Sequence, residues 1–182
     1  MNAAINKRIS KLMSLALRHK PKALGIELDA IGWCGSDELI NGLKRKGIEV
    51  DFDLLKEVVN ENDKQRFIFN EDGSKIRANQ GHSIDIDLEL VPAEPPEYLY
   101  HGTIKKFMDA IQREGLKKMS RQHVHLSHEK ETATNVGSRR GKAIVLTVRS
   151  GEMNRDGIEF YQSANGVWLT DKVMPHYILQ DD

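Results

Sequence analysis

The sequence predicts an α+β protein built from two lobes, with a boundary near residue 92. Before residue 62, apolar side chains recur at helical spacing in three separate segments. A proline-rich stretch, VPAEPPEY at residues 91–98, then interrupts the chain and is the best candidate for a linker. Beyond it, short apolar runs alternate with turns that contain glycine and asparagine, as is typical of strands.

Three helices are expected in the first lobe, residues 1–92. The first is expected where apolar residues from Ile5 to Ala16 follow helical spacing, and Pro21 ends it because the residue before a proline avoids the α region. Ser36 is expected to cap the second, DELINGLKRKG, whose acidic start and basic end suit the helix dipole. The third fits residues 51–62, DFDLLKEVVNEN.

A β-hairpin is expected after these helices, in RFIFNEDGSKIRAN at residues 66–79. Asp72 and Gly73 lie between two runs of alternating apolar residues, which is a strong hairpin signal. Three helices followed by a hairpin are typical of a winged-helix module, so we expect that fold for residues 1–92.

The second lobe, residues 93–182, is predicted to be mostly β with one or two helices. YLYHGT at residues 98–103 is expected to be a short strand that ends in a tight turn. FMDAIQREGLKKM is expected to be helical, with Gly115 as its C-cap. Further strands are expected in HVHLS, KAIVLTVRS, IEFYQSANGVWL and HYILQ, with a turn at Asn165–Gly166.

The charge balance argues against a broad nucleic-acid-binding surface. The chain has 27 Lys and Arg and 27 Asp and Glu, so its formal net charge is zero. An anionic ligand must therefore be bound by a few placed arginines. One cysteine, Cys34, allows no intrachain disulfide and no cysteine-based zinc site. With no signal-peptide-like start and no apolar run long enough for a bilayer, a cytoplasmic location without a membrane partner is expected.

Arg18 and His19 stand at the exit of the first predicted helix, just before Pro21. A guanidinium and an imidazole pointing about 100° apart can converge on a phosphate beyond the helix end. The alternative is a basic helix end that interacts with the dipole. Arg66 starts a predicted strand, where the alternative is an exposed strand-edge arginine.

Histidines and arginines recur in the second lobe. His101 to Thr103, HGT, suit close approach of a ligand to the backbone, or an ordinary turn. His123 and His125 share one face of a strand, which is also metal-ligand spacing, but ligand binding by one of them is the preferred interpretation. Residues 137–143, GSRRGKA, lack the spacing of a P-loop but allow a looser anion nest with guanidinium donors. The sequence offers no obvious protein nucleophile, so acid–base chemistry would fall to a histidine.

Eight strings taken in order resemble the NAD-dependent RNA 2'-phosphotransferase (tRNA 2'-phosphotransferase) family over nearly the whole chain. They are LALRHKP, LDAIGW, KQRFIF, IRANQGHS, YLYHGT, GLKKMSRQHVHLS, VGSRRGKAIVL and FYQSANGVWLT. Ala16 stands where leucine is expected more often, which affects packing and not chemistry. The resemblance implies a winged-helix lobe that binds the RNA phosphate at residues 1–92 and an ADP-ribosyltransferase-like, NAD-binding lobe at residues 93–182.

The resemblance also implies a reaction and its residues. An internal RNA 2'-phosphate is transferred to NAD in two steps, which yield RNA 2'-OH, nicotinamide and ADP-ribose 1'',2''-cyclic phosphate. The implied catalytic residues are Arg18, His19, Arg66 and Arg121. The implied NAD-binding residues are His101, Gly102, Thr103, His125, Leu126, Ser127 and, more loosely, Arg140, with Arg139 as its alternative. No metal is implied, and a monomer is expected.

Two other functions remain open from the sequence. One is a winged-helix DNA-binding regulator with a ligand-sensing β lobe, although the segment 37–47 is charge-mixed and the chain is neutral. The other is a protein or DNA ADP-ribosyltransferase, which would share the NAD lobe but stop after the first transfer.

Overall fold

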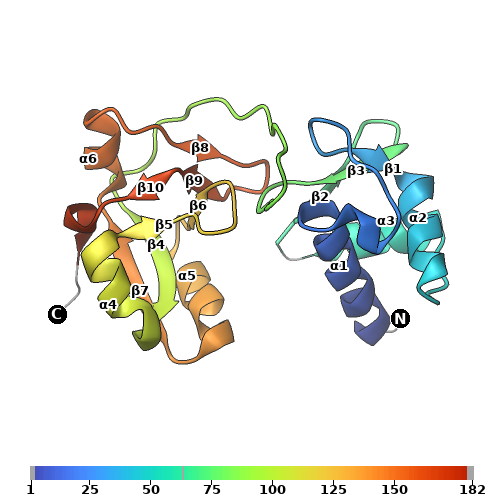
Figure 1. Cartoon of the computed structure of the whole chain (residues 1–182), viewed down its shortest axis with the longest axis horizontal. Helices are drawn as coiled ribbons and strands as arrows, with labels where there is room; N and C mark the ends of the chain where they lie inside the picture. Colours follow the sequence, from blue (N-terminus) through green and yellow to red (C-terminus); the bar gives the residue numbers. More distant parts are fainter. Residues whose placement is uncertain (1–2, 63, 180–182) are drawn as a thin grey trace. The chain divides into compact units, whose positions relative to one another are not determined.

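The structure is a computed structural model that describes residues 3–62 and 64–179, and it divides into two compact units, Met1–Glu89 and Leu90–Asp182 (Figure 1). Each unit mixes helices and strands, so the predicted α+β class is confirmed. The proline-rich stretch predicted as a linker is held by the second unit. Within that unit, the backbone N–H of Ala93 donates to the carbonyl of Phe160 (2.8 Å), and Ser150 Oγ donates to the carbonyl of Pro96 (2.7 Å).

The first unit contains the three predicted helices and the predicted hairpin. In order, its elements are α1 (Ala3–Arg18), η1 (Pro21–Ala23), β1 (Cys34–Gly35), α2 (Ser36–Arg45), α3 (Phe52–Asn60), β2 (Phe67–Phe69) and β3 (Lys75–Ala78). The short strand β1 was not predicted. It extends the hairpin into an antiparallel sheet of order β1-β3-β2, in which Cys34 lies opposite Ile76 and Phe67 lies opposite Ala78.

The ends of these helices follow the sequence with one exception. α1 ends at Arg18, and Pro21 begins the 3-10 helix η1. At α3, the Asp51 side chain accepts from the backbone N–H of Leu54 at 2.8 Å, as an N-cap does. The prediction that Ser36 caps α2 is wrong, because Ser36 is already helical. Its hydroxyl donates to the carbonyl of Gly73 (2.7 Å) and ties the helix to the hairpin turn.

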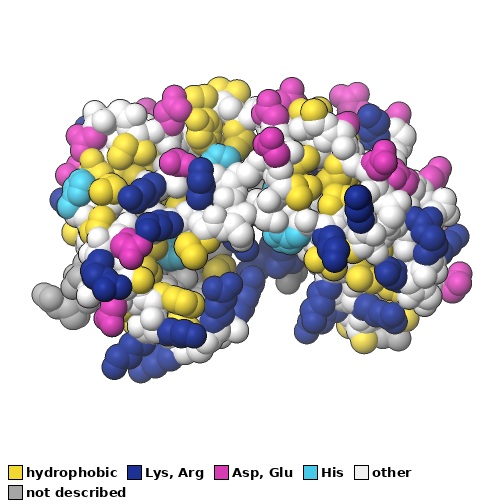
Figure 2. Space-filling model, viewed as in Figure 1, with side chains coloured by type: hydrophobic (Ala, Val, Ile, Leu, Met, Phe, Trp, Pro, Cys, Tyr) yellow, Lys and Arg dark blue, Asp and Glu magenta, His cyan; other side chains and the backbone are white. Residues whose placement is uncertain are grey.

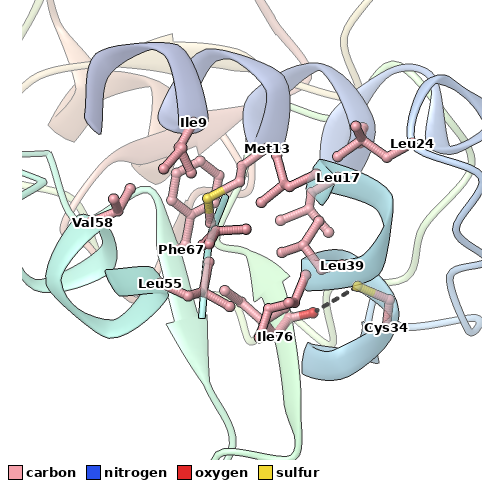
Figure 3. Packing of buried hydrophobic residues seen from close by; sticks show 14 of the residues in the cluster. Ile9, Met13, Leu17, Leu24, Cys34, Leu39, Leu55, Val58, Phe67 and Ile76 are labelled. Carbon is pink, nitrogen blue, oxygen red and sulfur yellow. Dashed lines mark hydrogen bonds between the residues drawn. The ribbon is translucent and has the colours of Figure 1, made fainter. Parts of the chain in front are cut away.

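The core of the first unit joins all three helices to the sheet (Figure 3). α1 presents the fully buried side chains of Ile9, Met13 and Leu17 toward the hairpin residues Phe67 and Ile76. Burying one such side chain stabilises a fold by about 1.5–3 kcal/mol. The same packing fixes the C-terminal end of α1 relative to the strands.

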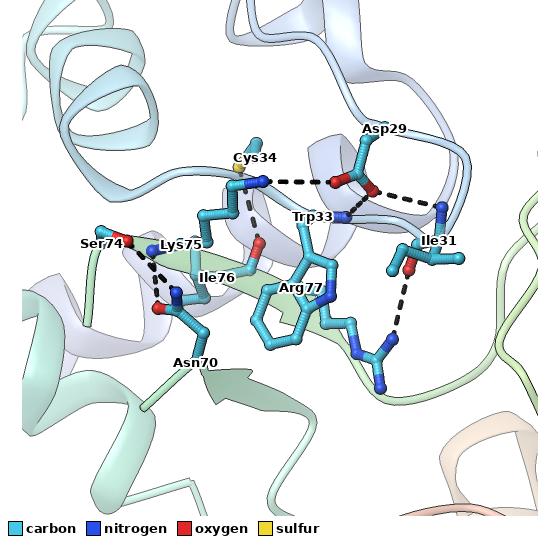
Figure 4. A network of polar contacts seen from close by, with 9 residues as sticks. All are labelled: Asp29, Ile31, Trp33, Cys34, Asn70, Ser74, Lys75, Ile76 and Arg77. Carbon is cyan, nitrogen blue, oxygen red and sulfur yellow. Dashed lines mark hydrogen bonds and ion pairs between the residues drawn. The ribbon is translucent and has the colours of Figure 1, made fainter. Parts of the chain in front are cut away.

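A loop between η1 and β1 is held on the sheet by polar contacts (Figure 4). The Asp29 carboxylate accepts from the backbone N–H groups of Ile31 (3.2 Å) and Trp33 (2.9 Å). From β3, Arg77 donates to the carbonyl of Ile31 (3.4 Å), and its guanidinium carbon lies 4.7 Å from the Trp33 ring centroid. Arg77 is thus committed to the structure of this loop.

The second unit is built from three small antiparallel sheets and three α-helices within the described residues. In order, its elements are β4 (Leu99–Ile104), α4 (Lys105–Glu114), β5 (Leu116–Lys117), β6 (Val124–Leu126), α5 (Lys130–Gly137), η2 (Ser138–Arg140), β7 (Ala143–Val148), α6 (Ser150–Arg155), β8 (Tyr161–Gln162), β9 (Trp168–Thr170), β10 (Lys172–Val173), η3 (Pro175–Tyr177) and β11 (Ile178–Leu179). The sheets have the orders β11-β7-β4, β6-β9-β8 and β10-β5.

Two expectations for this unit are wrong. One or two helices were expected, but the described part of the unit contains three α-helices, α4, α5 and α6. YLYHGT does not end in a tight turn, because β4 continues to Ile104 and pairs with β7 along its whole length. Two other expectations are confirmed. Gly115 closes α4 with φ +75°, and the backbone N–H of Gly166 donates to the carbonyl of Ser163 in the predicted turn.

Gly102 is required by the packing of α5 on β4. A Cβ at this position would overlap the carbonyl oxygen of Ala133 and would lie 2.8 Å from the backbone nitrogen of Gly137. The sequence suggested that this glycine lets a ligand approach the backbone. In the structure, the backbone of a helix takes up the space beside its Cα.

Charged groups of both signs lie on the visible face of each unit in the space-filling view (Figure 2). Figure 2 shows Lys and Arg as well as Asp and Glu on the visible face of both units, with apolar atoms between them. None of the helices among the described residues is both long and apolar enough to cross a membrane.

Candidate active site

Arg18 and His19 are both fastened to Ser83 at the C-terminal end of α1. The backbone N–H of Ser83 donates to the carbonyl of Arg18 (2.9 Å), and the Ser83 hydroxyl is hydrogen-bonded to Nδ1 of His19 (2.9 Å). The imidazole is solvent-exposed. Arg18 is half-buried, with its guanidinium carbon 6.0 Å from the Phe67 ring centroid. The predicted pair of donors is therefore oriented by a partner distant in the sequence.

Arg66 immediately precedes β2 and is fastened in a similar way. Its Nη1 donates to Oδ1 of Asn62 (3.3 Å), and its carbonyl accepts from the backbone N–H of Asn79 (2.9 Å). The Asn79 side chain donates to the carbonyl of Gln65 (2.5 Å), a residue held at φ +40°. Such backbone strain in a non-glycine residue persists only where the surroundings enforce it.

One segment, residues 79–83, thus contacts the backbone or side chain of all three predicted phosphate-binding residues of the first unit. Its Asn79, Gln80 and His82 are buried. Oδ1 of Asn79, Oε1 of Gln80 and both ring nitrogens of His82 lack a hydrogen-bond partner in the described part of the chain. Burial, followed by the nearby charges of Arg18, His19 and Arg77, lowers the pKa of His82 to about 4. His82 is therefore neutral at pH 7.

In the second unit, Arg121 forms a fixed arrangement with two histidines. Nη1 of Arg121 donates to Nδ1 of His125 (2.9 Å), so this nitrogen is an acceptor and the proton lies on Nε2. The His125 carbonyl can only accept, so Nδ1 of His101 is its donor (3.0 Å) and Nε2 of His101 carries the lone pair. Burial lowers the pKa of His101 and favours this neutral form.

Two further arginines lie close to Arg121. The Arg121 side chain is exposed overall, but part of it is surrounded by protein. This partial burial lowers the pKa of Arg121, and the charges of Arg140 and Arg139 lower it further. Both neighbours lie on η2, in the predicted GSRRGKA nest. Among the described carboxylates, none forms an ion pair with these three guanidiniums. A bound anion would relieve their mutual repulsion.

The remaining residues predicted to bind NAD lie on β4 and β6. The Leu126 side chain is in the hydrophobic core and Thr103 is buried, so ligand contacts from Leu126 are limited to its backbone. Ser127 exchanges two backbone hydrogen bonds with Tyr100, at 2.8 and 2.9 Å, which pairs the end of β6 with β4. This pairing explains how His101 reaches the carbonyl of His125.

The two alternating histidines of HVHLS have different partners. The His123 ring lies against the Tyr161 ring, with centroids 5.8 Å apart and an angle of 60° between the rings, whereas His125 contacts Arg121. Within the described residues, no three His, Cys, Asp or Glu side chains are grouped so as to hold a metal ion.

The sequence did not single out the residues that orient the site in the first unit. Asn62, Asn79 and Ser83 are short polar side chains whose importance depends on contacts across the fold. A signal was present in IRANQGHS, where polar residues follow directly on a strand. The signal covers Asn79 and Ser83 but not Asn62, which lies outside this string.

The sequence matches a known protein family over most of its length. Residues 5–172 match the family described as RNA 2'-phosphotransferase, Tpt1 / KptA family. The chain belongs to this family. It is 61% identical over 178 residues to a protein of Flavobacterium johnsoniae named probable RNA 2'-phosphotransferase, with 98% of each chain covered. A protein of Fusobacterium nucleatum with the same name is 49% identical over 172 residues, covering 94% of this chain and 96% of its own.

Membership of the RNA 2'-phosphotransferase family confirms the resemblance found in the sequence. It does not assign roles to individual residues, and the predicted catalytic and NAD-binding residues stay predictions. Within the first unit, the structure brings Arg18, His19 and Arg66 onto one supporting segment. Within the second unit, it brings Arg121, His125 and His101 into one hydrogen-bonded series.

Proposed function

We propose that this protein transfers an internal RNA 2'-phosphate to NAD. Family membership supports the phosphotransferase activity. The observation that carries the residue assignment is the support of Arg18, His19 and Arg66 by the single segment 79–83. A dianionic phosphate ester needs several oriented hydrogen-bond donors, and Arg18, His19 and Arg66 are the residues proposed to supply them.

In the first step, an oxygen of the RNA 2'-phosphate attacks C1'' of the nicotinamide riboside of NAD. The bond between C1'' and the nicotinamide nitrogen breaks, and nicotinamide leaves with the bonding electron pair. The nucleophile is already an anion, so the protein needs to position it and not to deprotonate it. We assign this positioning to Arg18, Arg66 and Arg121, which bind the phosphate oxygens.

In the second step, the 2''-hydroxyl of the ADP-ribose attacks phosphorus and the bond to the RNA O2' breaks. The hydroxyl proton is lost and the leaving RNA oxygen gains one, which gives RNA 2'-OH and ADP-ribose 1'',2''-cyclic phosphate. A histidine can carry out both transfers near neutral pH. Because Ser83 holds the His19 ring through Nδ1, we assign the transfers to Nε2.

For the NAD substrate, we propose that the neutral His101 accepts a ribose hydroxyl hydrogen bond at Nε2. Its Nδ1 is occupied by the carbonyl of His125, and its low pKa keeps Nε2 unprotonated. Arg140 or Arg139 suits the pyrophosphate, since both lie on η2 and are near enough to Arg121 for their charges to lower its pKa. The other proposed NAD contacts are Gly102, Thr103, Leu126 and Ser127.

The direct test is incubation with NAD and an oligonucleotide that carries one internal 2'-phosphate, followed by mass analysis of both products. We expect 2'-hydroxyl RNA and ADP-ribose cyclic phosphate, and no product from the matched oligonucleotide without the 2'-phosphate. An ADP-ribosylated end product would instead indicate an ADP-ribosyltransferase. His19→Ala should accumulate ADP-ribosylated RNA, and a normal second step in that variant would remove His19 from this role.

No metal ion takes part in the proposed steps, in which arginines supply the positive charge. Turnover measured after dialysis against EDTA should therefore equal turnover in untreated enzyme. The control is the same EDTA-treated sample with Mg²⁺ or Zn²⁺ restored. Activity that disappears with EDTA and returns with the metal would show that the arginines are insufficient.

A further inference from the structure

We propose that a cavity at one end of the sheet β6-β9-β8 binds a nucleobase of the RNA acceptor, which stacks on Tyr161 and turns an edge toward His123. This inference rests on the proposed function, because it names a second contact for the same RNA substrate. The sheet lies wholly within the second unit (Figure 1).

The cavity has a volume of about 620 Å³, which lies within the range of small-ligand sites and suits a nucleoside. It opens where the segment before β6, the end of β9 and the segment before β8 come together. Its lining residues are Lys118, Gln122, His123, Gly157, Ile158, Glu159, Tyr161, Thr170 and Asp171.

Two rings in the cavity wall can contact a base, Tyr161 by stacking and the tilted ring of His123 at the edge of the base. The centroids of His123 and Tyr161 lie 5.8 Å apart at 60°, and both side chains are half-buried, so each is held in place and still accessible. Burial, and then the charge of Lys118, lowers the pKa of His123, so its ring is neutral at pH 7. Stacking of a base on an aromatic side chain contributes about 1–3 kcal/mol to binding.

The cavity also presents polar groups that can meet the edge of a base. Lys118 donates to the Asp171 carboxylate (2.6 Å), and the Tyr161 hydroxyl donates to Glu159 (2.7 Å). Glu159 can accept from exocyclic amino groups, and the Gln122 amide both donates and accepts. An aromatic surface edged by such groups is how proteins recognise unpaired RNA bases.

The position of the cavity favours the RNA acceptor over NAD. Gln122 and His123 directly follow Arg121, the residue assigned to the 2'-phosphate. The side chain of Val124 is in the core, so His125 lies on the opposite face of β6, and His123 is the residue immediately before this strand. Tyr161 is on this face as well, because it lies opposite Leu169, which lies opposite His125.

The strand proposed to hold the NAD ribose belongs to a different sheet. His101, Gly102 and Thr103 lie on β4, which pairs with β7, and none of them lines the cavity. The cavity residues therefore form a separate subsite beside the arginine that binds the phosphate.

The test compares Tyr161→Ala with the wild type on a short single-stranded RNA carrying one internal 2'-phosphate. The control is Tyr98→Ala, which removes a 45% exposed tyrosine of the same unit that does not line the cavity. Loss of one stacking partner should raise the KM for RNA about 5- to 150-fold. The KM for NAD should stay constant, and Tyr98→Ala should match the wild type in both constants.

A second substrate isolates the base. When the nucleotides flanking the phosphate are made abasic, the wild type should lose affinity and Tyr161→Ala should lose nothing further. Tyr161→Phe keeps the ring and should lose far less than Tyr161→Ala, which separates stacking from a folding defect. The proposal would be overturned if Tyr161→Ala lost the same affinity relative to the wild type on normal RNA as on abasic RNA. It would also be overturned if Tyr161→Ala raised the KM for NAD and left the KM for RNA unchanged.

Direct binding makes the result independent of the proposed reaction. Fluorescence anisotropy of the labelled 2'-phosphorylated RNA, without NAD, measures affinity whether or not the enzyme turns over. Wild-type protein that yields no cyclic phosphate would contradict the proposed function alone. Equal anisotropy titrations for wild type and Tyr161→Ala would contradict the base-binding cavity alone.

Discussion

The two units hold their candidate site residues by different physical means. In the first unit, His19 and the backbones of Arg18 and Arg66 are hydrogen-bonded by neutral groups of one segment, residues 79–83. In the second unit, Arg121 is hydrogen-bonded to His125 and lies near two further arginines. The first arrangement favours orientation, and the second concentrates positive charge.

This difference matches the two demands of the proposed reaction. Aligning a phosphate oxygen with C1'' requires donors that are already in place, because ordering them during the reaction would cost entropy. Stabilising the charge that gathers on phosphorus requires a strong positive field in a partly desolvated place.

The largest effect is expected from Arg121→Ala, which removes the charge at the centre of the second unit's cluster. By analogy with the loss of an oxyanion donor, kcat should fall by roughly 10²–10³-fold. Arg113→Ala is the matched control, since Arg113 is an exposed arginine of the same unit on the last turn of α4. Turnover of Arg121→Ala within a few-fold of the control would remove this residue from the site.

The next effect concerns the strand that carries His101. Gly102→Ala places a Cβ against the carbonyl of Ala133 in α5, so β4 and α5 must separate or distort. The free energy of unfolding of the second unit should fall by about 3 kcal/mol or more. Trp168 fluorescence reports on this unit and Trp33 on the first, so thermal unfolding followed in single-tryptophan variants separates the two.

Gly35→Ala is the control for this substitution, since its Cβ would meet only ordinary contacts, the nearest at 3.5 Å from Cβ of Glu38. An unchanged Trp168 transition in Gly102→Ala would mean that α5 can move away at little cost.

Local chemistry explains which parts of the fold could be predicted. Pro21, the Asp72–Gly73 turn and the Gly115 cap act through their own backbone preferences, and the structure contains all three features. The Ser36 cap failed because the hydroxyl had a better partner in Gly73, which only the folded hairpin supplies. α5 was missed because KETATNVG has two threonines and few apolar residues, and its packing on β4 decides its conformation.

The same distinction between local chemistry and contacts of the folded chain applies to the candidate site residues. Arg18, His19 and Arg121 could be named from their place in matched strings, because the residue types themselves suit a phosphate. Ser83 and Asn79 could not, since each acts on a residue of another element through a contact of the folded chain.

Acid should weaken the first unit through His82. The pKa of His82 is about 4 in the folded chain and about 6.5 when unfolded, so the unfolded chain binds more protons between these values. The contribution of neutral His82 to the free energy of unfolding is fully present above pH 6.5. It is lost as the pH falls toward 4, and the total loss is about 3 kcal/mol. Urea unfolding of the wild type at several pH values, followed by Trp33 fluorescence, measures this loss.

The control for this pH dependence is His82→Gln, which keeps a polar side chain but cannot titrate in this range. Its stability should change less with pH than that of the wild type between pH 6.5 and 4. The pKa values of His101 and His123 in the second unit are also lowered, so Trp168 should still report acid destabilisation in the variant. Parallel pH profiles for wild type and His82→Gln at Trp33 would contradict a neutral, buried His82.

The smallest effect is expected from Ser83→Ala, which leaves His19 in place but removes the hydroxyl bonded to its Nδ1. A net hydrogen bond contributes about 0.5–1.5 kcal/mol, so kcat should fall about 2- to 10-fold while the KM for NAD stays constant. Ser83→Thr should restore most of the activity. The matched control is Ser74→Ala, which removes an exposed hydroxyl bonded to Asn70 in the hairpin turn of the same unit. A pH–rate profile that shifts in Ser83→Ala but not in Ser74→Ala would show that proton transfer by His19 depends on the orientation of its ring. Identical profiles for wild type and Ser83→Ala would leave charge as the only contribution of the first unit to the reaction.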